Sequence, residues 1–254
     1  LVAESTPVKG NIEFNNLSFT YPDTGITALK NVSFTVEPGE TLAIVGNTGS
    51  GKSTILELIG RLYDVEENML KIDDTDIRQL NLNDLRNSIG YVPQDSFLFS
   101  DSLRNNIRFG KEDATEEEVI QAAKNAAVHK NIIGFTKGYD TVLGERGITL
   151  SGGQKQRISI ARAIIKDPQI LLFDDSLSAV DTETEEEILQ NLNSLSSNKT
   201  TIIVSHRISS VKNANKIIVL DNGEIIQKGS HQELVNSEGY YKELYAMQLL
   251  EKEM

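Results

Sequence analysis

One glycine-rich run in this chain reads Gly46-Asn47-Thr48-Gly49-Ser50-Gly51-Lys52-Ser53, followed by Thr54. It matches the phosphate-binding P-loop pattern G-x-x-x-x-G-K-[ST] at every required position. Residues 41–45 before it are typical of a short buried strand, and residues 54–59 after it are typical of a helix start. A loop between a strand and a helix presents backbone N–H groups and the positive end of the helix to phosphate oxygens. Lys52 would add a charge and Ser53 would offer its hydroxyl to Mg²⁺, so we predict a nucleoside triphosphate site.

The composition of the chain limits the function classes. Its 254 residues, 39% hydrophobic and 24% charged, allow one large globular domain. The net charge of −12 argues against a nucleic-acid surface, because phosphate backbones are bound by clustered lysine and arginine. Cysteine is absent, which excludes disulfides and thiolate metal sites. No run approaches the roughly 20 apolar residues of a membrane span and no signal peptide follows Leu1, so we expect a cytosolic domain cut from a longer protein.

Apolar patterning predicts an α/β organisation. Residues 11–19 and 32–36 alternate in polarity, which predicts two strands joined through a turn. Further strands are expected at 41–45, 69–72, 89–92, 169–173, 200–204 and 217–220. From Ser100 to about Lys166 the apolar period changes to 3.6, which indicates helices. We therefore predict one domain over 1–254, with a core from 1–99 and 167–254 and a helical insertion over 100–166.

Carboxylates follow one of the apolar strands. Residues 170–173 are typical of a strand buried on both faces, and Asp174 and Asp175 come directly after it. In P-loop hydrolases a carboxylate at such a strand end holds Mg²⁺, usually through a water. We assign this role to Asp174, and we expect Asp175 to position or deprotonate the attacking water. Gln94 follows the strand expected at 89–92 and would reach the same edge of the sheet.

Several motifs occur together in one order. After the P-loop come Leu150-Ser151-Gly152-Gly153-Gln154, the acidic strand end, Ser178-Ala179-Val180-Asp181 and Ser205-His206-Arg207. In this order and spacing the chain resembles, from about Gly10 to Tyr245, the nucleotide-binding domain of ATP-binding cassette (ABC) transporters. Segments 8–19, 144–147 and 229–234 resemble exporters of this family rather than importers. The resemblance implies a RecA-like P-loop NTPase core, an N-terminal antiparallel β subdomain and an inserted all-α subdomain.

The resemblance also implies roles for single residues. Tyr21 would stack on adenine, and Gly46 to Thr54 would surround the phosphates of ATP. Gln94 would contact Mg²⁺ and the attacking water, and His206 would contact the γ-phosphate. The signature residues Ser151 to Gln154 would bind the γ-phosphate held by a second, partner cassette, because this family sandwiches ATP between two domains head to tail.

Each of these members also has a plain structural interpretation. The glycine-rich run could be a turn that happens to precede Lys52, and Tyr21 could be a packing residue. Asp181, which the resemblance places between the two ATP sites, also suits the N-cap of a helix ending near Leu195. His206 alone could be a partly exposed histidine at a strand end. Only the joint arrangement favours the functional roles.

One position departs from the family pattern. The residue after the Mg²⁺ aspartate is usually Glu in an active cassette, and here it is Asp175. The shorter side chain withdraws the carboxylate by about 1 Å, and a displacement of that size can cost on the order of 10²-fold in rate. We therefore expect slow hydrolysis with ATP binding retained, as in the degenerate half of a heterodimeric multidrug exporter whose other cassette carries Glu. A homodimer in which Asp175 still works, but less well, is the alternative.

The sequence thus predicts an ATP hydrolase coupled to transmembrane transport. It would use ATP and Mg²⁺ at the cytoplasmic face of the cell membrane, with exporter transmembrane domains and a second cassette as partners. A soluble ABC ATPase of translation or DNA repair is a second reading, but the net charge and length offer no basic face and no tandem cassette. A nucleotide-gated regulatory module without useful turnover is a third, and Asp175 is the residue that motivates it.

Overall fold

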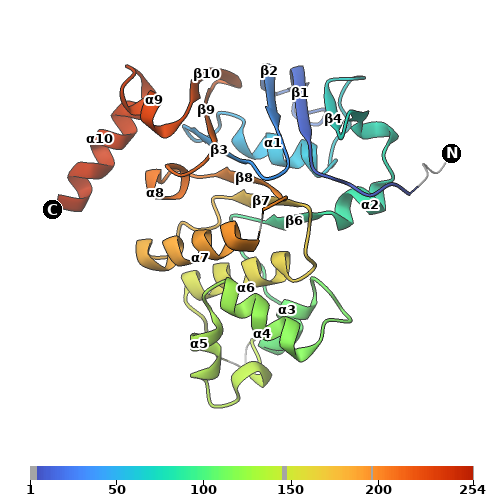
Figure 1. The fold of residues 1–254 in the computed structure, drawn as a ribbon, viewed down its shortest axis with the longest axis vertical. Coiled ribbons are helices and arrows are strands. Elements are labelled where there is room, and N and C mark those ends of the chain that lie inside the picture. Colours follow the sequence, from blue (N-terminus) through green and yellow to red (C-terminus); the bar gives the residue numbers. More distant parts are fainter. Residues whose placement is uncertain (1–4, 145–147, 196, 254) are drawn as a thin grey trace.

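Among the described residues, two β-sheets occupy the upper part of the view in Figure 1. The computed structural model of the chain describes residues 5–144, 148–195 and 197–253. The smaller sheet has the strand order β2-β1-β4-β5, and each neighbouring pair is antiparallel. Its strands are β1 Ile12–Thr20, β2 Thr27–Val36, β4 Leu70–Ile72 and β5 Thr75–Asp76. The predicted N-terminal antiparallel β subdomain is therefore confirmed.

The larger sheet brings the P-loop and the acidic strand end to one edge. Its order is β10-β9-β3-β8-β7-β6, in which only β10 runs antiparallel to its neighbour. The strands are β3 Thr41–Gly46, β6 Ile89–Val92, β7 Ile170–Asp174, β8 Thr200–Val204, β9 Lys216–Asp221 and β10 Glu224–Gly229. At the end of β8, Val204 is paired with Ile44 of β3 on one side and with Asp174 of β7 on the other. The loop after β3 and the end of β7 thus lie on either side of the end of β8.

The parallel strands β7 and β8 are buried on both faces, as their apolar runs predict. All residues of β7 and β8 are buried. Leu172 belongs to the core that the two sheets share with α1 (Lys52–Ile59), and its neighbour Phe173 belongs to a second core formed with the helices. The alternation follows from the two-residue period of a strand. Helix α1, which begins at Lys52 within the P-loop, is thereby fixed between the sheets.

A block of helices lies between β6 and β7 in the sequence and projects from the sheets at the lower end of Figure 1. It consists of α3 Leu103–Arg108, α4 Glu116–Asn125, α5 His129–Ile133, the 3₁₀ turn η2 Gly138–Asp140 and α6 Gly152–Ile164. Helix α4 begins at the predicted capping box of Thr115 and Glu118. The division of the chain at residues 100 and 166 remains a prediction. Within the exporter-like segment 144–147, residues 145–147 lie outside the described residues.

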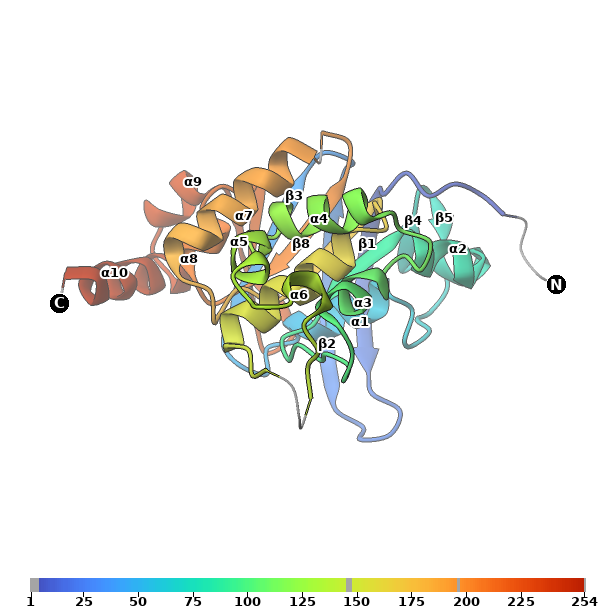
Figure 2. The ribbon, with the colours of Figure 1, turned by 90° about the horizontal axis from the view of Figure 1, so that it is seen from below.

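The remaining helices surround the sheets. They are η1 Ile77–Gln79, α2 Leu82–Asn87, α7 Thr182–Leu195, α8 Ile208–Val211, α9 His231–Val235 and α10 Tyr240–Glu253. Figure 2 shows α10 reaching out at one end of the molecule, opposite the end where the N-terminal segment lies. In the part of the chain that the structure describes, every helix is too short or too polar to cross a membrane.

Two predicted element boundaries were wrong. Strand β2 begins at Thr27 rather than at Val32, because the ladder with β1 is interrupted by register shifts that break the polarity alternation. Asn31 lies within β2 with a left-handed φ of 49°, which is a further interruption. Helix α1 begins at Lys52 rather than at Thr54, because its N-cap is Gly51 in the P-loop itself.

Candidate functional site

The P-loop requires glycine at Gly51. This residue has a φ of +104°, which L side chains rarely adopt. A Cβ added there would also lie 2.5 Å from the carbonyl oxygen of Ala28 on β2. The absence of a side chain therefore lets strand β2 pack directly against the loop, which is held between β3, α1 and β2.

Lys52 is turned back onto its own loop. Its Nζ donates hydrogen bonds to the carbonyl oxygens of Gly46 at 2.9 Å and Asn47 at 2.6 Å, and to Ser50 Oγ at 3.4 Å. The side chain is buried, and this burial lowers the pKa of Lys52, while the nearby charges of Asp175 and Asp174 act in the opposite direction. The ammonium group is thus held by hydrogen bonds to its own loop, and it interacts electrostatically with the carboxylates of Asp174 and Asp175.

Asp174 connects three elements at the edge of the sheet. Ser53 Oγ of α1 donates to Asp174 Oδ1 at 3.0 Å, and the hydroxyl of Tyr91 on β6 donates to Asp174 Oδ2 at 3.2 Å. Burial raises the pKa of Tyr91, and the charge of Asp174 adds to this effect. Tyr91 was not predicted from the sequence, because its contact depends on the pairing of β6 with β7 and no local pattern indicates it. Both carboxylate oxygens are thus held by hydroxyl groups.

The oxygen atoms of Ser53 and Asp174 fit a Mg²⁺ ion bound together with a phosphate. Mg²⁺ prefers hard oxygen ligands and usually takes only one or two carboxylates, with phosphate oxygens and waters completing its shell. Among the described residues, no group of three or more His, Cys, Asp or Glu side chains is placed to hold a metal ion by itself. An ion at this edge would therefore be held by Ser53, by Asp174 through a water, and by Gln94, with the nucleotide supplying the remaining oxygens.

Asp175 lies beside the P-loop in an unusual backbone conformation. Its φ is 48°, and its N–H donates to the carbonyl oxygen of Val204 on β8 at 2.8 Å. Burial raises the pKa of Asp175, whereas the charge and backbone of His206 and the charge of Lys52 lower it. The carboxylate of Asp175 is thus partly desolvated and placed next to two groups that can carry positive charge.

Most of the predicted site residues line one cavity of about 530 Å³. Its lining includes Tyr21, Thr48, Gly49, Gly51, Lys52, Ser53, Thr54, Gln94, Asp174, Asp175 and His206. Residues that the sequence did not indicate also line it, namely Ile26, Thr27, Ala28 and Lys30 of β2 and its approach, Val204 at the end of β8, and Asn222 and Gly223 in the hairpin turn. The cavity therefore extends from the acidic strand end across the P-loop to the antiparallel sheet.

Tyr21 is both a lining residue and an anchored one. Its hydroxyl lies 2.7 Å from Thr54 Oγ1 and donates to Glu57 Oε2 at 2.7 Å. Its ring meets Phe19 and Tyr63 edge to face. Burial raises the pKa of Tyr21 to about 12, with the Glu57 carboxylate contributing. The packing role is thus observed, and the stacking on adenine remains a prediction.

The signature residues lie apart from this cavity. Ser151 caps α6, with its Oγ accepting from the N–H of Gln154, and none of the residues from Ser151 to Gln154 lines the cavity. A Cβ on Gly153 would lie 2.8 Å from the carbonyl oxygen of Ala179, so the start of α6 packs tightly on the loop after β7. Ser151 is exposed and Gln154 is partly buried, and their role toward a second cassette remains a prediction.

Asp181 caps helix α7. Its Oδ1 accepts from the N–H of Thr184 at 2.9 Å, and its Oδ2 accepts from Thr184 Oγ1 at 2.8 Å. These hydrogen bonds lower the pKa of Asp181. The N-cap interpretation is therefore observed, and a bridge between two ATP sites remains a prediction.

A parallel sheet with a lysine-bearing P-loop beside an acidic strand end defines the chain as a P-loop NTPase domain. The family model described as ABC transporter matches residues 29–178. The chain belongs to the ABC transporter family and has the fold of its nucleotide-binding domain.

The relatives include transporters and exporters. ATP-binding cassette sub-family B member 6 of Xenopus tropicalis is 49% identical over 239 residues, which are 94% of this chain and 28% of the relative. The putative multidrug export ATP-binding/permease protein YgaD of Bacillus subtilis is 49% identical over 243 residues, which are 96% and 42% of the two proteins. The solved structure of a bacterial Atm1-family ABC exporter with ATP bound aligns with a TM-score of 0.90 at 43% identity, covering 97% of this chain and 43% of that one. The chain thus spans less than half the length of these relatives.

Proposed function

We propose that this chain is the ATP-binding and ATP-hydrolysing domain of a membrane exporter, acting at the cytoplasmic face of the membrane. The observation that carries the proposal is the single cavity in which Lys52, Ser53, Asp174, Asp175 and His206 converge. A phosphate chain in this cavity would displace the hydrogen bonds that Lys52 makes to its own loop, and the loop N–H groups would take up phosphate oxygens. The exporter relatives, with their longer chains, support transmembrane domains as partners.

The residues divide the chemistry of hydrolysis among themselves. Bound Mg²⁺ would neutralise charge on the phosphate oxygens. Gln94 and Asp175 would orient the attacking water, and Asp175 would accept its proton as the bond between the γ-phosphorus and the bridging oxygen breaks. His206 would donate a hydrogen bond to the γ-phosphate. Tyr21 would contact the adenine from its place beside β2.

The arrangement supports a head-to-tail pair of cassettes. Ser151 lies outside the cavity of its own chain and is exposed, which supports a signature that binds the γ-phosphate of a second cassette. Because Asp175 stands where Glu is usual, the chain's own site would hydrolyse slowly, on the order of 10²-fold below a site with Glu. The favoured partner is therefore a non-identical cassette with Glu at the matching position, whose active site Ser151 to Gln154 of this chain would complete.

A nucleotide-gated module without useful turnover is the second candidate, and Asp175 is the observation that favours it. The test compares ATP affinity and phosphate release for the chain alone and for its mixture with a Glu-bearing cassette, using Lys52→Met as the control. We expect tight Mg²⁺-dependent ATP binding, slow release alone and faster release in the mixture. Release that stays at the Lys52→Met level in both samples would refute the hydrolase and leave the regulatory module.

A further inference from the structure

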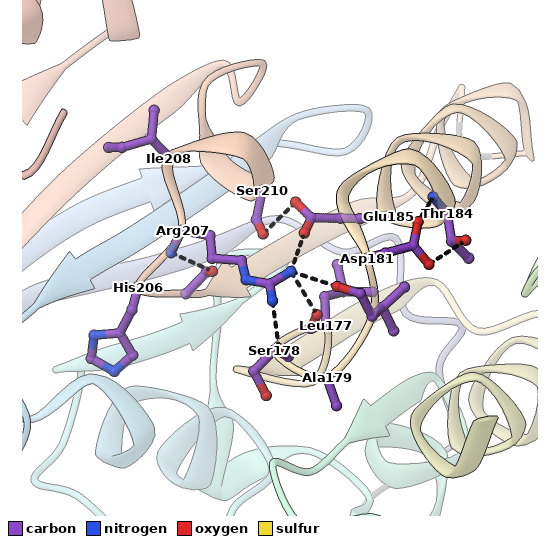
Figure 3. A network of polar contacts seen from close by, with 12 residues as sticks. Leu177, Ser178, Ala179, Asp181, Thr184, Glu185, His206, Arg207, Ile208 and Ser210 are labelled. Atoms are coloured by element: carbon purple, nitrogen blue, oxygen red, sulfur yellow. Dashed lines mark hydrogen bonds and ion pairs between the residues drawn. The ribbon is translucent and has the colours of Figure 1, made fainter. Parts of the chain in front are cut away.

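The guanidinium group of Arg207 holds the loop that follows β7. Its Nη1 donates to the carbonyl oxygens of Val180 at 2.6 Å and Leu177 at 3.3 Å, and its Nη2 donates to that of Ser178 at 2.6 Å (Figure 3). Arg207 directly follows His206, which lines the ATP cavity. One side chain thus ties the segment that carries His206 to the loop over 177–180.

The same guanidinium is fixed by a buried carboxylate. Arg207 Nη1 donates to Glu185 Oε2 at 3.0 Å, and the side chain of Glu185 on α7 is completely buried. The other oxygen of Glu185 accepts from Ser210 Oγ of α8 at 2.7 Å, as Figure 3 shows. A buried carboxylate needs such partners, because an unpaired charge in the interior is strongly unfavourable. Glu185 thereby sets the direction in which Arg207 points.

The backbone around Arg207 is also held by helix α10. Gln248 of α10 donates from Nε2 to the carbonyl oxygen of His206 at 2.6 Å and accepts at Oε1 from the N–H of Ile208 at 2.8 Å. The segment 206–208 is therefore anchored to α10, and Arg207 extends from this fixed base to the loop.

The loop that Arg207 holds begins at a residue with a left-handed backbone. Asp175 has a φ of 48°, a region that Asp enters more readily than residues with longer side chains. Its N–H is tied to Val204, and the carbonyl groups held by Arg207 start two residues later. The loop is also fixed by Gln156 of α6, whose Oε1 accepts from the N–H of Ala179 at 2.9 Å. Arg207 is the side chain in this group that joins the loop directly to the segment bearing His206.

We propose that Arg207, oriented by Glu185, is a positioning residue for ATP hydrolysis. It holds the turn at Asp175 and the segment at His206 in one mutual geometry, so that both side chains face the same cavity. Arg207 itself does not line that cavity, and ATP affinity depends on the P-loop. Loss of Arg207 therefore lowers the rate of the chemical step and leaves ATP binding almost unchanged. This inference rests on the proposed function.

The test uses the full chain and measures ATP affinity and single-turnover phosphate release from labelled MgATP, with the chain in excess. The variants are Arg207→Met, the conservative Arg207→Lys, and Glu185→Gln combined with Arg207→Met, which avoids leaving a buried carboxylate unpaired. The matched control is Lys212→Met, because Lys212, the residue after α8, pairs with Glu186 of α7 at 3.5 Å and neither side chain is buried. Thermal unfolding confirms that each sample is folded.

We expect Arg207→Met and the double variant to lose at least about tenfold in release rate with a Kd for ATP within about threefold, because misalignment near 1 Å has effects of this size. Arg207→Lys should recover part of the rate, and Lys212→Met should match the wild type. If the wild type releases phosphate faster than Lys52→Met, and the folded Arg207→Met and double variants release it as fast as Lys212→Met, the role of Arg207 is refuted and the hydrolytic function stands. Wild-type release equal to Lys52→Met refutes the hydrolytic function, and the inference falls with it.

Discussion

Replacing Asp175 by Glu should make the chain's own site faster and the fold slightly less stable. The added methylene advances the carboxylate by about 1 Å, which is the displacement for which effects of up to about 10²-fold are known. The carboxylate already lies beside the cavity that contains Lys52 and His206, so its advance is directed into the site. We therefore expect phosphate release to rise by about 10- to 100-fold with little change in ATP affinity.

The stability cost follows from the backbone of Asp175. Its φ of 48° lies in the left-handed region, where Asp and Asn are enriched and other non-glycine residues are disfavoured by roughly 1–2 kcal/mol. Glu lacks the short side chain that makes the region tolerable, so the variant should lose up to about 1 kcal/mol in the free energy of unfolding. For a chain of this length that loss lowers Tm by about 2–4 °C.

The assay for this prediction combines phosphate release with thermal unfolding, and Asp175→Asn is the matched control. Asn retains the shape and the left-handed tolerance of Asp but cannot accept a proton, so its Tm should not fall below the wild-type value while release falls. The reasoning fails if Asp175→Glu binds ATP normally and releases phosphate no faster than the wild type. It also fails if the Asn and Glu variants lose the same amount of Tm.

Three further predictions concern packing, hydrogen bonding and pH. Gly153→Ala should lower the free energy of unfolding by about 1–3 kcal/mol, because its Cβ would lie 2.8 Å from the backbone oxygen of Ala179. Gly152→Ala should lower it less, because the nearest atom to its Cβ would be 3.4 Å away. Urea unfolding of the two variants compares these costs. Tyr21→Phe should lower the free energy of unfolding by about 0.5–1.5 kcal/mol, because it removes two hydrogen bonds. ATP affinity should stay unchanged, and a large loss of ATP affinity would contradict the proposal that the ring, rather than the hydroxyl, contacts adenine. Burial raises the pKa of Asp175, so the stability from its protonated form is present below the ordinary pKa of 3.8 and is lost as the pH rises through the higher folded pKa. Asp175→Asn does not titrate and should therefore gain stability relative to the wild type across that pH window. Curves of unfolding free energy against pH that run parallel for the two proteins would contradict this.

The local motifs made the centre of the fold predictable from sequence. The P-loop pattern includes its own strand and helix, and the apolar run 170–173 identified a buried strand whose acidic end had to share an edge with the loop. Parallel pairing then brought Asp174 and Ser53 to within 3.0 Å of each other, as their strand-end positions indicated. These features depend on short segments and on one rule about parallel strands.

Contacts made by long side chains across elements were not predictable in this way. Tyr91 reaches Asp174, and Lys30 lines the cavity, only because β6 and β2 take particular places in the two sheets. In the motif Ser205-His206-Arg207 a role was predicted for His206, whereas Arg207 makes the larger set of contacts. Glu185, the partner of Arg207, lies in an acidic run that is typical of a solvated helix face. The side chain of Glu185 is nevertheless completely buried.

The position of the signature bears on what one chain can do alone. In the function that we propose, the cavity provides the groups for the phosphates, the metal ion and the attacking water. Ser151 is exposed and lies outside the cavity, so a γ-phosphate bound there would have no signature from its own chain. If two cassettes pair head to tail as we propose, each ATP is enclosed by the cavity of one chain and the signature of the other. A Glu-bearing partner would then place its better base opposite the intact Ser151 of this chain, while Asp175 would face the partner's signature. The two sites would differ chiefly in the length of one carboxylate, and this suffices for unequal turnover because the rate depends steeply on that distance while ATP affinity depends on the P-loop.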